Sequence, residues 1–199
     1  MANLTALDGR GLDSPNVAVT AARVAGWQRE GYRNIILNTL SPSFSQDYRT
    51  SLEGHMMVAL FQGYDAAAYE TESGRVRALQ AVAAAREVLY PAGGYIFVDI
   101  EATGSIAASH MIDWINNWCG AVQAARYGAG AYFGVPQPLT AAEAYARLIA
   151  DRYWRSCSAD GITPARRACC IVQESCSGSW DVDRCGADNF GDYCLGAAL

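Results

Sequence analysis

The chain of 199 residues contains no lysine, and all 15 of its basic residues are arginine. The absence of lysine excludes a Walker phosphate-binding loop, a Schiff-base lysine and Ser–Lys catalysis. GxSxG and GxGxxG motifs are also absent, and the two histidines, His55 and His110, stand far apart without an HExxH motif. Any catalysis must therefore depend on carboxylates, tyrosine, cysteine or a cofactor, and no motif indicates a cofactor.

Long apolar runs and basic clusters are missing as well. The longest apolar stretch of any weight, residues 56–61, is far shorter than the roughly 20 residues of a membrane helix. The first residues lack the basic and apolar regions of a signal peptide. The net charge of −5, without a basic run, argues against nucleic acid as a partner. We therefore expect neither a membrane nor a nucleic acid as a partner.

Cysteine, by contrast, is abundant in the C-terminal part, residues 157–194. Cys119 stands alone, and the other six cysteines are Cys157, Cys169, Cys170, Cys176, Cys185 and Cys194. Without a CxxC motif or a nearby histidine, a structural zinc site is disfavoured. The six are disulfide candidates of unknown connectivity, with buried reduced thiols as the alternative.

Disulfide bonds need an oxidising compartment, although the chain begins without an export signal. A phage-encoded protein would satisfy both conditions, since it leaves the cell by lysis or inside a virion and oxidises afterwards. The expected location is therefore extracellular or virion-associated after synthesis in the cytoplasm.

Apolar runs and helical patterns alternate along the chain. Strands are expected at residues 4–12, 34–40, 56–61, 95–100, 129–135, 153–156, 169–173 and 179–182. Helices are expected at residues 14–31, opened by Ser14-Pro15, and at 45–52, 72–89, 105–126 and 140–150, the last opened by a Thr140/Glu143 capping box.

About eight strands with intervening helices predict parallel pairing and right-handed crossovers. The α/β fold expected is a small (β/α)8 TIM-type barrel, a single domain over residues 1–199, with some late helices reduced to loops. A doubly wound open sheet is the structural alternative. In a barrel, polar residues at the carboxyl ends of the strands would converge on one mouth.

The strongest local signal is Asp99 and Glu101, which lie on the same face of their strand, about 6–7 Å apart along it. Two inward carboxyl groups at close range raise one pKa and leave a proton donor beside an ionised group. Glycoside cleavage needs such a pair. Two alternatives remain: ordinary strand-end charges in solvent or paired with arginine, and a divalent metal site shared with Asp13 and Asp181.

Val98-Asp99-Ile100-Glu101 resembles the D-x-E signature of glycoside hydrolase family 25, the muramidase family, and of the related barrels of domain of unknown function 1906. Four further segments are similar to those barrels in the same order: Gly11-Leu12-Asp13, Gly130-Ala-Tyr132-Phe-Gly134, Ile171-Val-Gln173 and Trp180-Asp181-Val-Asp183. The sequence departs from the pattern where Asp183 replaces a usual asparagine and Glu174 a usual aromatic residue.

The resemblance implies that Glu101 is the general acid and that Asp99 stabilises the transition state or orients the substrate N-acetyl group. It also implies substrate-binding residues, namely Asp13, Asp181, Asp183, Tyr64, Tyr132 and Gln173. The function expected is that of a muramidase-type glycosidase acting on the glycan of peptidoglycan, phage-encoded or virion-associated and in contact with other virion proteins. The alternative is a non-catalytic structural or receptor-binding tail protein that keeps the barrel.

Overall fold

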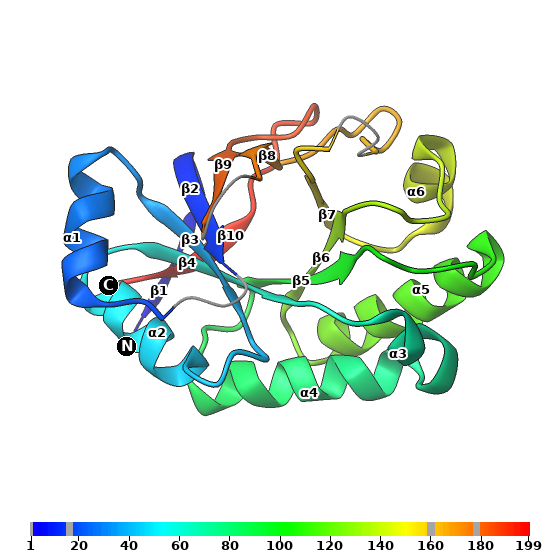
Figure 1. Cartoon of the computed structure of the whole chain (residues 1–199), viewed down its shortest axis with the longest axis horizontal. Helices are drawn as coiled ribbons and strands as arrows, with labels where there is room; N and C mark the ends of the chain where they lie inside the picture. The colour runs from blue at the N-terminus through cyan, green and yellow to red at the C-terminus, as the bar shows by residue number, and fades with distance from the viewer. Residues whose placement is uncertain (1, 15–17, 159–161, 177–179) are drawn as a thin grey trace.

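The computed structural model describes residues 2–14, 18–158, 162–176 and 180–199, and its strands form a closed eight-stranded barrel (Figure 1). Around the ring these strands are β2 (Gly9–Ser14), β3 (Asn34–Asn38), β4 (Met57–Gln62), β5 (Tyr95–Ile100), β6 (Gly128–Phe133), β7 (Arg152–Arg155), β8 (Ile171–Ser175) and β9 (Asp181–Cys185). Outside the ring, β1 (Asn3–Ala6) pairs with β10 (Leu195–Ala198), which pairs with the start of β4. The barrel prediction is confirmed, and the open-sheet alternative is wrong.

The strands of the ring run parallel from β2 to β8, whereas β9 is antiparallel to both of its neighbours. Only residues 176–180 connect β8 to β9, and a parallel return needs a crossover of a dozen or more residues. The expectation of an all-parallel ring is therefore wrong for this strand. Because β9 is reversed, its first residue, Asp181, lies at the same rim as the carboxyl ends of the other strands.

In the view of Figure 1, helices flank the barrel on the left, below and on the right, whereas none is drawn beside β8 and β9 at the top. In chain order they are α1 (Ala21–Arg29), α2 (Phe44–Glu53), α3 (Ala66–Thr71), α4 (Gly74–Glu87), α5 (Ala108–Ala124) and α6 (Ala141–Arg147). Beyond β7 the described residues contain no helix, as expected for late helices reduced to loops. None of the helices described is long and apolar enough to cross a lipid bilayer.

The N-terminal segment differs from the prediction in two ways. The single strand expected at 4–12 is two strands, separated where Leu7 turns its side chain into the barrel and Gly9 adopts a φ of +78°. Helix α1 begins at Ala21, where Thr20 Oγ1 accepts a hydrogen bond from the backbone N–H of Arg23. The predicted start at Ser14-Pro15 falls partly outside the described residues.

The predicted helix at 72–89 is α4, which begins at Gly74 with Ser73 as its N-cap. A Cβ at Gly74 would overlap the carbonyl oxygen of Trp114, so the absence of a side chain lets α4 pack directly on α5. The capping box of Thr140 and Glu143 is present at the start of α6, as predicted.

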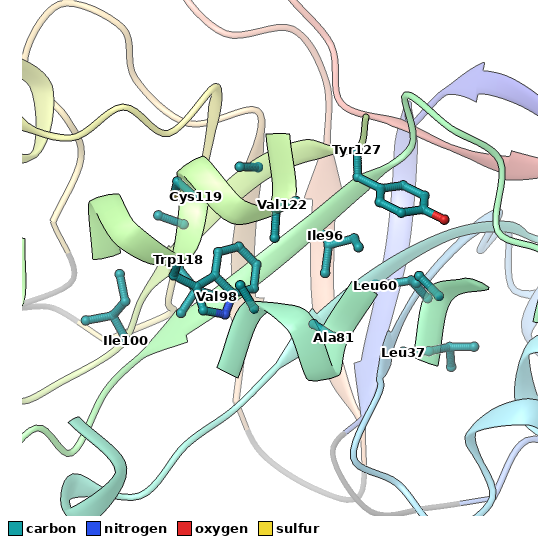
Figure 2. Close-up of a cluster of buried hydrophobic side chains, with 14 of the residues drawn as sticks. Leu37, Leu60, Ala81, Ile96, Val98, Ile100, Trp118, Cys119, Val122 and Tyr127 are labelled. Atoms are coloured by element: carbon teal, nitrogen blue, oxygen red, sulfur yellow. The ribbon is translucent and has the colours of Figure 1, made fainter. Parts of the chain in front are cut away.

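The core has two layers, which β5 separates by strict alternation. Ile96, Val98 and Ile100 pack outward against the helices, with Trp118 of α5 among the residues that cover them (Figure 2). Tyr95 and Phe97 point into the barrel, where they join a smaller apolar cluster. The alternation continues into Asp99 and directs its carboxyl group to the inside of the barrel.

Two disulfide bonds, Cys157–Cys176 and Cys170–Cys194, crosslink the part of the chain that lacks helices. Cys169 and Cys185 are free thiols, so the disulfide prediction is wrong for these two. Cys169 packs against the outer core, on the face opposite to its neighbour Cys170. Cys185 shares the inner cluster with Cys170 and Cys194, which bond to each other and leave it without a partner.

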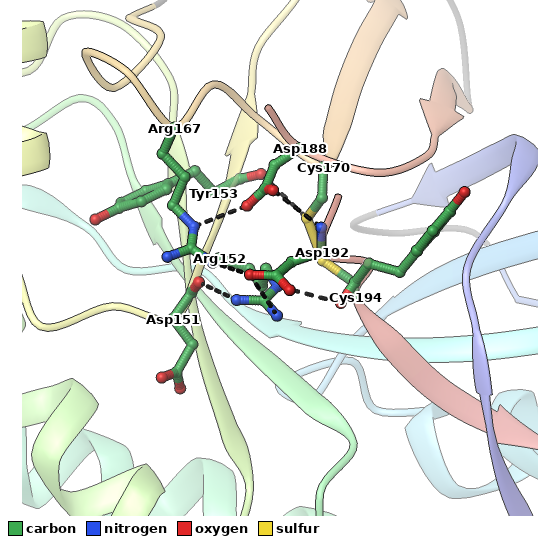
Figure 3. The surroundings of a disulfide bond; sticks show 9 residues. Asp151, Arg152, Tyr153, Arg167, Cys170, Asp188, Asp192 and Cys194 are labelled. Carbon is green, nitrogen blue, oxygen red and sulfur yellow. Dashed lines mark hydrogen bonds and ion pairs between the residues drawn. A yellow bond between two sulfur atoms is a disulfide. The ribbon is translucent and has the colours of Figure 1, made fainter. Parts of the chain in front are cut away.

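Ion pairs surround the Cys170–Cys194 disulfide (Figure 3). Arg167 Nε lies 2.7 Å from Asp188 Oδ2, and Arg167 Nη2 lies 2.5 Å from Asp192 Oδ2. Arg152 Nη2 lies 3.4 Å from the same Asp192 oxygen. These contacts fasten the connection between β9 and β10 to the barrel.

Candidate active site

The carboxyl-end rim of the barrel contains a cavity of about 240 Å³. Four acidic side chains line it, and no arginine or histidine is among its described lining residues. The acidic residues are Asp13, Asp99, Glu101 and Asp181, and the remaining lining residues are Phe61, Tyr132, Val135, Trp154, Ser156, Ser158, Gln173 and Cys176. The cavity is therefore strongly acidic, and it joins residues from both ends of the chain.

Asp99 and Glu101 reach this cavity together, as their spacing in the sequence predicted. Burial is the main reason that the pKa of Asp99 lies well above its usual value, and the charges of Glu101 and Asp13 raise it further. Burial and then the charge of Asp181 raise the pKa of Glu101. Glu101 is half-buried, so its carboxyl group can hold a proton and still meet a ligand.

Two glycines make room for this acid pair. A Cβ at Gly134 would overlap Glu101 Oε2 and lie 2.5 Å from the Cβ of Glu101. A Cβ at Gly63 would lie 3.1 Å from Asp99 Oδ2. Gly134 directly follows β6, where the sequence pattern included it only as part of a motif, so its steric role was missed.

Gln173 organises the opposite wall of the cavity. Its Nε2 donates to Asp13 Oδ2 at 2.9 Å and to Asp181 Oδ2 at 3.1 Å. Its Oε1 accepts from the Tyr132 hydroxyl at 3.1 Å and from the backbone N–H of Cys157 at 3.2 Å. Because both the nitrogen and the oxygen of the Gln173 amide are hydrogen-bonded, the amide fixes the carboxyl groups of Asp13 and Asp181 relative to the Tyr132 ring.

Asp13 and Asp183 form a second acidic pair below the rim. Burial is the largest cause that raises the pKa of Asp13 to about 7, while its hydrogen bond with Asp183 acts in the opposite direction. Asp183, which the resemblance implied as a substrate-binding residue, has no exposed surface and is not among the described lining residues of the cavity. Burial raises its pKa well above the usual value, and the charge of Asp13 adds to this.

Tyr64 requires a correction, because it does not line the cavity. Its hydroxyl donates to Gln62 Oε1 at 2.6 Å and accepts from Trp118 Nε1 at 2.9 Å, and its ring packs on Tyr69 and Trp114. Tyr132, by contrast, lines the cavity. Trp154, whose place near a strand end is compatible with stacking on a sugar, lines the cavity, and its ring centroid lies 4.5 Å from that of Tyr132.

A metal site built from the acidic residues was the other chemical alternative. Within the described ranges, no group of three or more histidine, cysteine, aspartate or glutamate side chains is arranged to hold a metal ion. The geometry thus gives this alternative no support.

Comparison with known proteins agrees with the fold. A family model described as "Rv2525c-like, glycoside hydrolase-like domain" matches residues 39–168. No curated protein matches the chain in sequence.

Solved structures show the same barrel at low sequence identity. An uncharacterised protein of B. stearothermophilus has a TM-score of 0.68 at 18% identity, over 88% of this chain and 95% of that one. The catalytic domain of endolysin ply40 from bacteriophage P40 of Listeria monocytogenes has a TM-score of 0.54 at 14% identity, over 90% and 94%.

The modular autolysin LytC from Streptococcus pneumoniae, solved with a synthetic peptidoglycan ligand, is similar with a TM-score of 0.55 at 10% identity. The match covers 87% of this chain but only 46% of LytC.

Proposed function

The chain belongs to the family of Rv2525c-like, glycoside hydrolase-like domains, and from this premise we propose that it is a glycosidase that cleaves the glycan strands of peptidoglycan. The observation that carries the proposal is the pair of carboxyl groups, Asp99 and Glu101, in an acidic cavity without a basic side chain among its described lining residues. The structural likeness to an autolysin and an endolysin supports the choice of substrate.

Glu101 is the general acid of the proposed reaction. Its raised pKa keeps a proton available, and the proton passes to the glycosidic oxygen as the bond to the sugar carbon breaks. Water adds its hydroxyl group to that carbon and returns its other proton to the acid pair, so each cleavage forms one new reducing end and restores the enzyme. Asp99, which is set deeper, stabilises the oxocarbenium-like transition state or orients the N-acetyl group of the sugar.

The opposite wall forms the sugar subsite. Asp13 and Asp181, both held by Gln173, offer carboxylate oxygens to sugar hydroxyl groups, and Tyr132 offers an aromatic edge. These roles require that the Gln173 hydrogen bonds keep the two carboxyl groups in place while the acid pair reacts.

Release of soluble fragments from purified cell walls tests the enzymatic function. We expect the wild type to release them and Glu101→Gln to be slower by a factor of about 10²–10⁴, the usual contribution of a general acid. Glu70→Gln is the matched control, because Glu70 is exposed on α3 and lies outside the cavity. If the folded wild type is as inert as Glu101→Gln, the glycosidase proposal fails, and a structural or receptor-binding barrel replaces it.

We also propose that the protein works outside the cytoplasm and is phage-encoded or virion-associated. Two disulfide bonds are expected to persist only in an oxidising environment, and the likeness to an endolysin catalytic domain supports a phage origin. Mass spectrometry without reductant should show a chain lighter by about four hydrogen masses than the reduced form. Equal masses would rule out the disulfides and with them the argument for this location.

A further inference from the structure

Asp183 is a buried acidic side chain that the proposed chemistry does not use. It has no exposed surface, and its Oδ1 accepts a hydrogen bond from Trp154 Nε1 at 2.9 Å. Its Oδ2 is buried without a conventional donor among the described residues. An ionised carboxylate with one unsatisfied oxygen in this position would be costly.

Asp183 lies beside another carboxyl group, that of Asp13. The two side chains come from paired strands, since Asp183 is opposite Gly11 in the β2–β9 ladder, and they lie within hydrogen-bond reach of each other. A hydrogen bond between two carboxyl groups requires a proton on one of them. Asp13 Oδ2 accepts a hydrogen bond from Gln173 Nε2 at 2.9 Å.

Among the described residues, no positive charge is paired with these two carboxyl groups. Within the described structure, none of the ion pairs involves Asp13 or Asp183. β7 and β8 face the pair with the uncharged side chains of Trp154 and Gln173. The titratable groups that interact with it are Asp181 and Cys185 of β9, Glu101, which follows β5, Asp99 of β5 and Tyr132 of β6. All of these are acidic, so the surroundings favour retention of a shared proton.

We propose that Asp183 is a positioning residue that stays protonated, donates its proton to Asp13 in a hydrogen bond, and thereby fixes Asp13 and the Gln173 network against the cavity. The effect of Asp183 on catalysis rests on the proposed function, whereas the protonation of Asp183 is independent of that function. With Asp183 protonated, Asp13 accepts from Asp183 at one oxygen and from Gln173 at the other. When the proton leaves, two adjacent negative charges repel each other, and Asp13 loses this fixed orientation.

Asparagine reproduces the proposed protonation state. In Asp183→Asn, the amide oxygen can accept from Trp154 Nε1 and the amide nitrogen can donate to Asp13, in the same positions and without a titratable proton. Asp183→Ala removes both contacts and leaves the Trp154 and Asp13 groups unpaired. Asp183→Asn therefore keeps the hydrogen bonds of the protonated side chain but cannot ionise, whereas Asp183→Ala loses the hydrogen bonds as well.

The first test measures thermal stability as a function of pH, without activity. Burial raises the pKa of both carboxyl groups in the folded protein, so above about pH 4 the folded pair holds a proton that the unfolded chain has released, and stability falls as the pH rises. We expect the fall in Tm from about pH 5 to about pH 8 to be smaller in Asp183→Asn than in the wild type. The infrared band of a protonated carboxyl group should also be weaker in this variant near neutral pH. Equal pH dependence and an unchanged band would overturn the proposal.

The second test measures turnover of purified peptidoglycan at acidic pH. We expect Asp183→Asn to retain most of the wild-type kcat/KM, while Asp183→Ala loses about tenfold or more, mainly in kcat. If asparagine is as damaging as alanine in a folded protein, the positioning role is wrong. If the wild type shows no turnover, the proposed function fails, and the stability and infrared measurements still decide the protonation of Asp183.

Discussion

Two arcs of the barrel are stabilised by different means. The helical arc, residues 34–155, carries parallel strands β3 to β7 and buries large side chains such as Trp118 against its helices. The crosslinked arc, residues 162–198 together with Cys157, carries β8, β9 and β10 and is fastened by two disulfide bonds and the Arg167 ion pairs. Where few helices are available to bury apolar surface, covalent links take over part of the stabilisation.

The candidate site lies where the arcs meet. Asp99, Glu101 and Tyr132 come from the helical arc, and Gln173 and Asp181 come from the crosslinked arc. Asp13 is on β2, which joins one arc to the other. Glu101, the acid of the proposed reaction, follows strand β5, whose outer face is held by apolar packing. Asp13 and Asp181, the proposed sugar-binding groups, are held by hydrogen bonds from Gln173.

The largest loss of activity is expected from a substitution in the helical arc that displaces Glu101. In Gly134→Ala the new methyl group would overlap the Glu101 carboxyl group and displace it, and we expect kcat/KM to fall about 100-fold. Gly120→Ala in α5 is the control, since its nearest neighbour would be Ile149 Cδ1 at an ordinary 3.7 Å. Equal activity of the two variants would show that Glu101 does not need its present position.

Removal of the disulfides should separate activity from stability within the crosslinked arc. Cys157 and Cys176 flank the Gln173 hydrogen bonds, and Cys176 lines the cavity, so replacing both by serine should reduce kcat/KM about tenfold. Replacing Cys170 and Cys194 by serine should lower the free energy of unfolding by about 3 kcal/mol and leave the activity of the folded protein intact.

Chemical denaturation and turnover, measured on both double variants at a temperature where each is folded, check this prediction. The expected difference between the two disulfides would be wrong if the Cys170/Cys194 variant lost activity while the Cys157/Cys176 variant kept it.

A smaller effect, on the pH dependence of activity, is expected from the charge of Asp181 in the crosslinked arc acting on Glu101 in the helical arc. The raised pKa of Glu101 keeps it protonated, so activity should be highest at acidic pH and decline as the pH rises through that value. Asp181→Asn removes a negative charge that raises this pKa, and the decline should move to lower pH by about one unit or less. The pH profile of kcat for the two proteins measures the shift, and a move to higher pH would be inconsistent with the assignment.

The smallest effect concerns Tyr64, which belongs to the packing of the helical arc. Tyr64→Phe removes its hydrogen bonds with Gln62 and Trp118 and should cost about 1 kcal/mol of stability with no change in kcat/KM. Tyr132→Phe removes a bond to Gln173 and should reduce kcat/KM measurably. A loss of activity confined to Tyr64→Phe would restore Tyr64 as a substrate contact.

The sequence predicted the helical arc well, because its strands and helices have clear periodicity. Alternation along Tyr95–Ile100 was sufficient to place Asp99 on the inner face, and the capping box at Thr140 located a helix start. The crosslinked arc was predicted less well. Leu195–Ala198 is short and rich in small residues, so β10 and its pairing with β1 had no pattern to reveal them.

Parts of the site were also beyond sequence reasoning, since they depend on three-dimensional packing. Nothing in the chain order shows that Tyr64 turns toward Trp118 rather than into the barrel. The same holds for the choice of Cys170 and Cys194 as partners, which requires knowledge of which cysteines share the inner cluster.

Mass spectrometry of the fragments released from purified peptidoglycan tests the central claim most directly, because it identifies the bond that breaks. The account predicts fragments with new reducing sugar ends, produced by the wild type and by Glu70→Gln, and by Glu101→Gln at a rate lower by a factor of about 10²–10⁴. Fragments with intact glycan strands and new peptide ends, or identical products from Glu101→Gln at the wild-type rate, would contradict it.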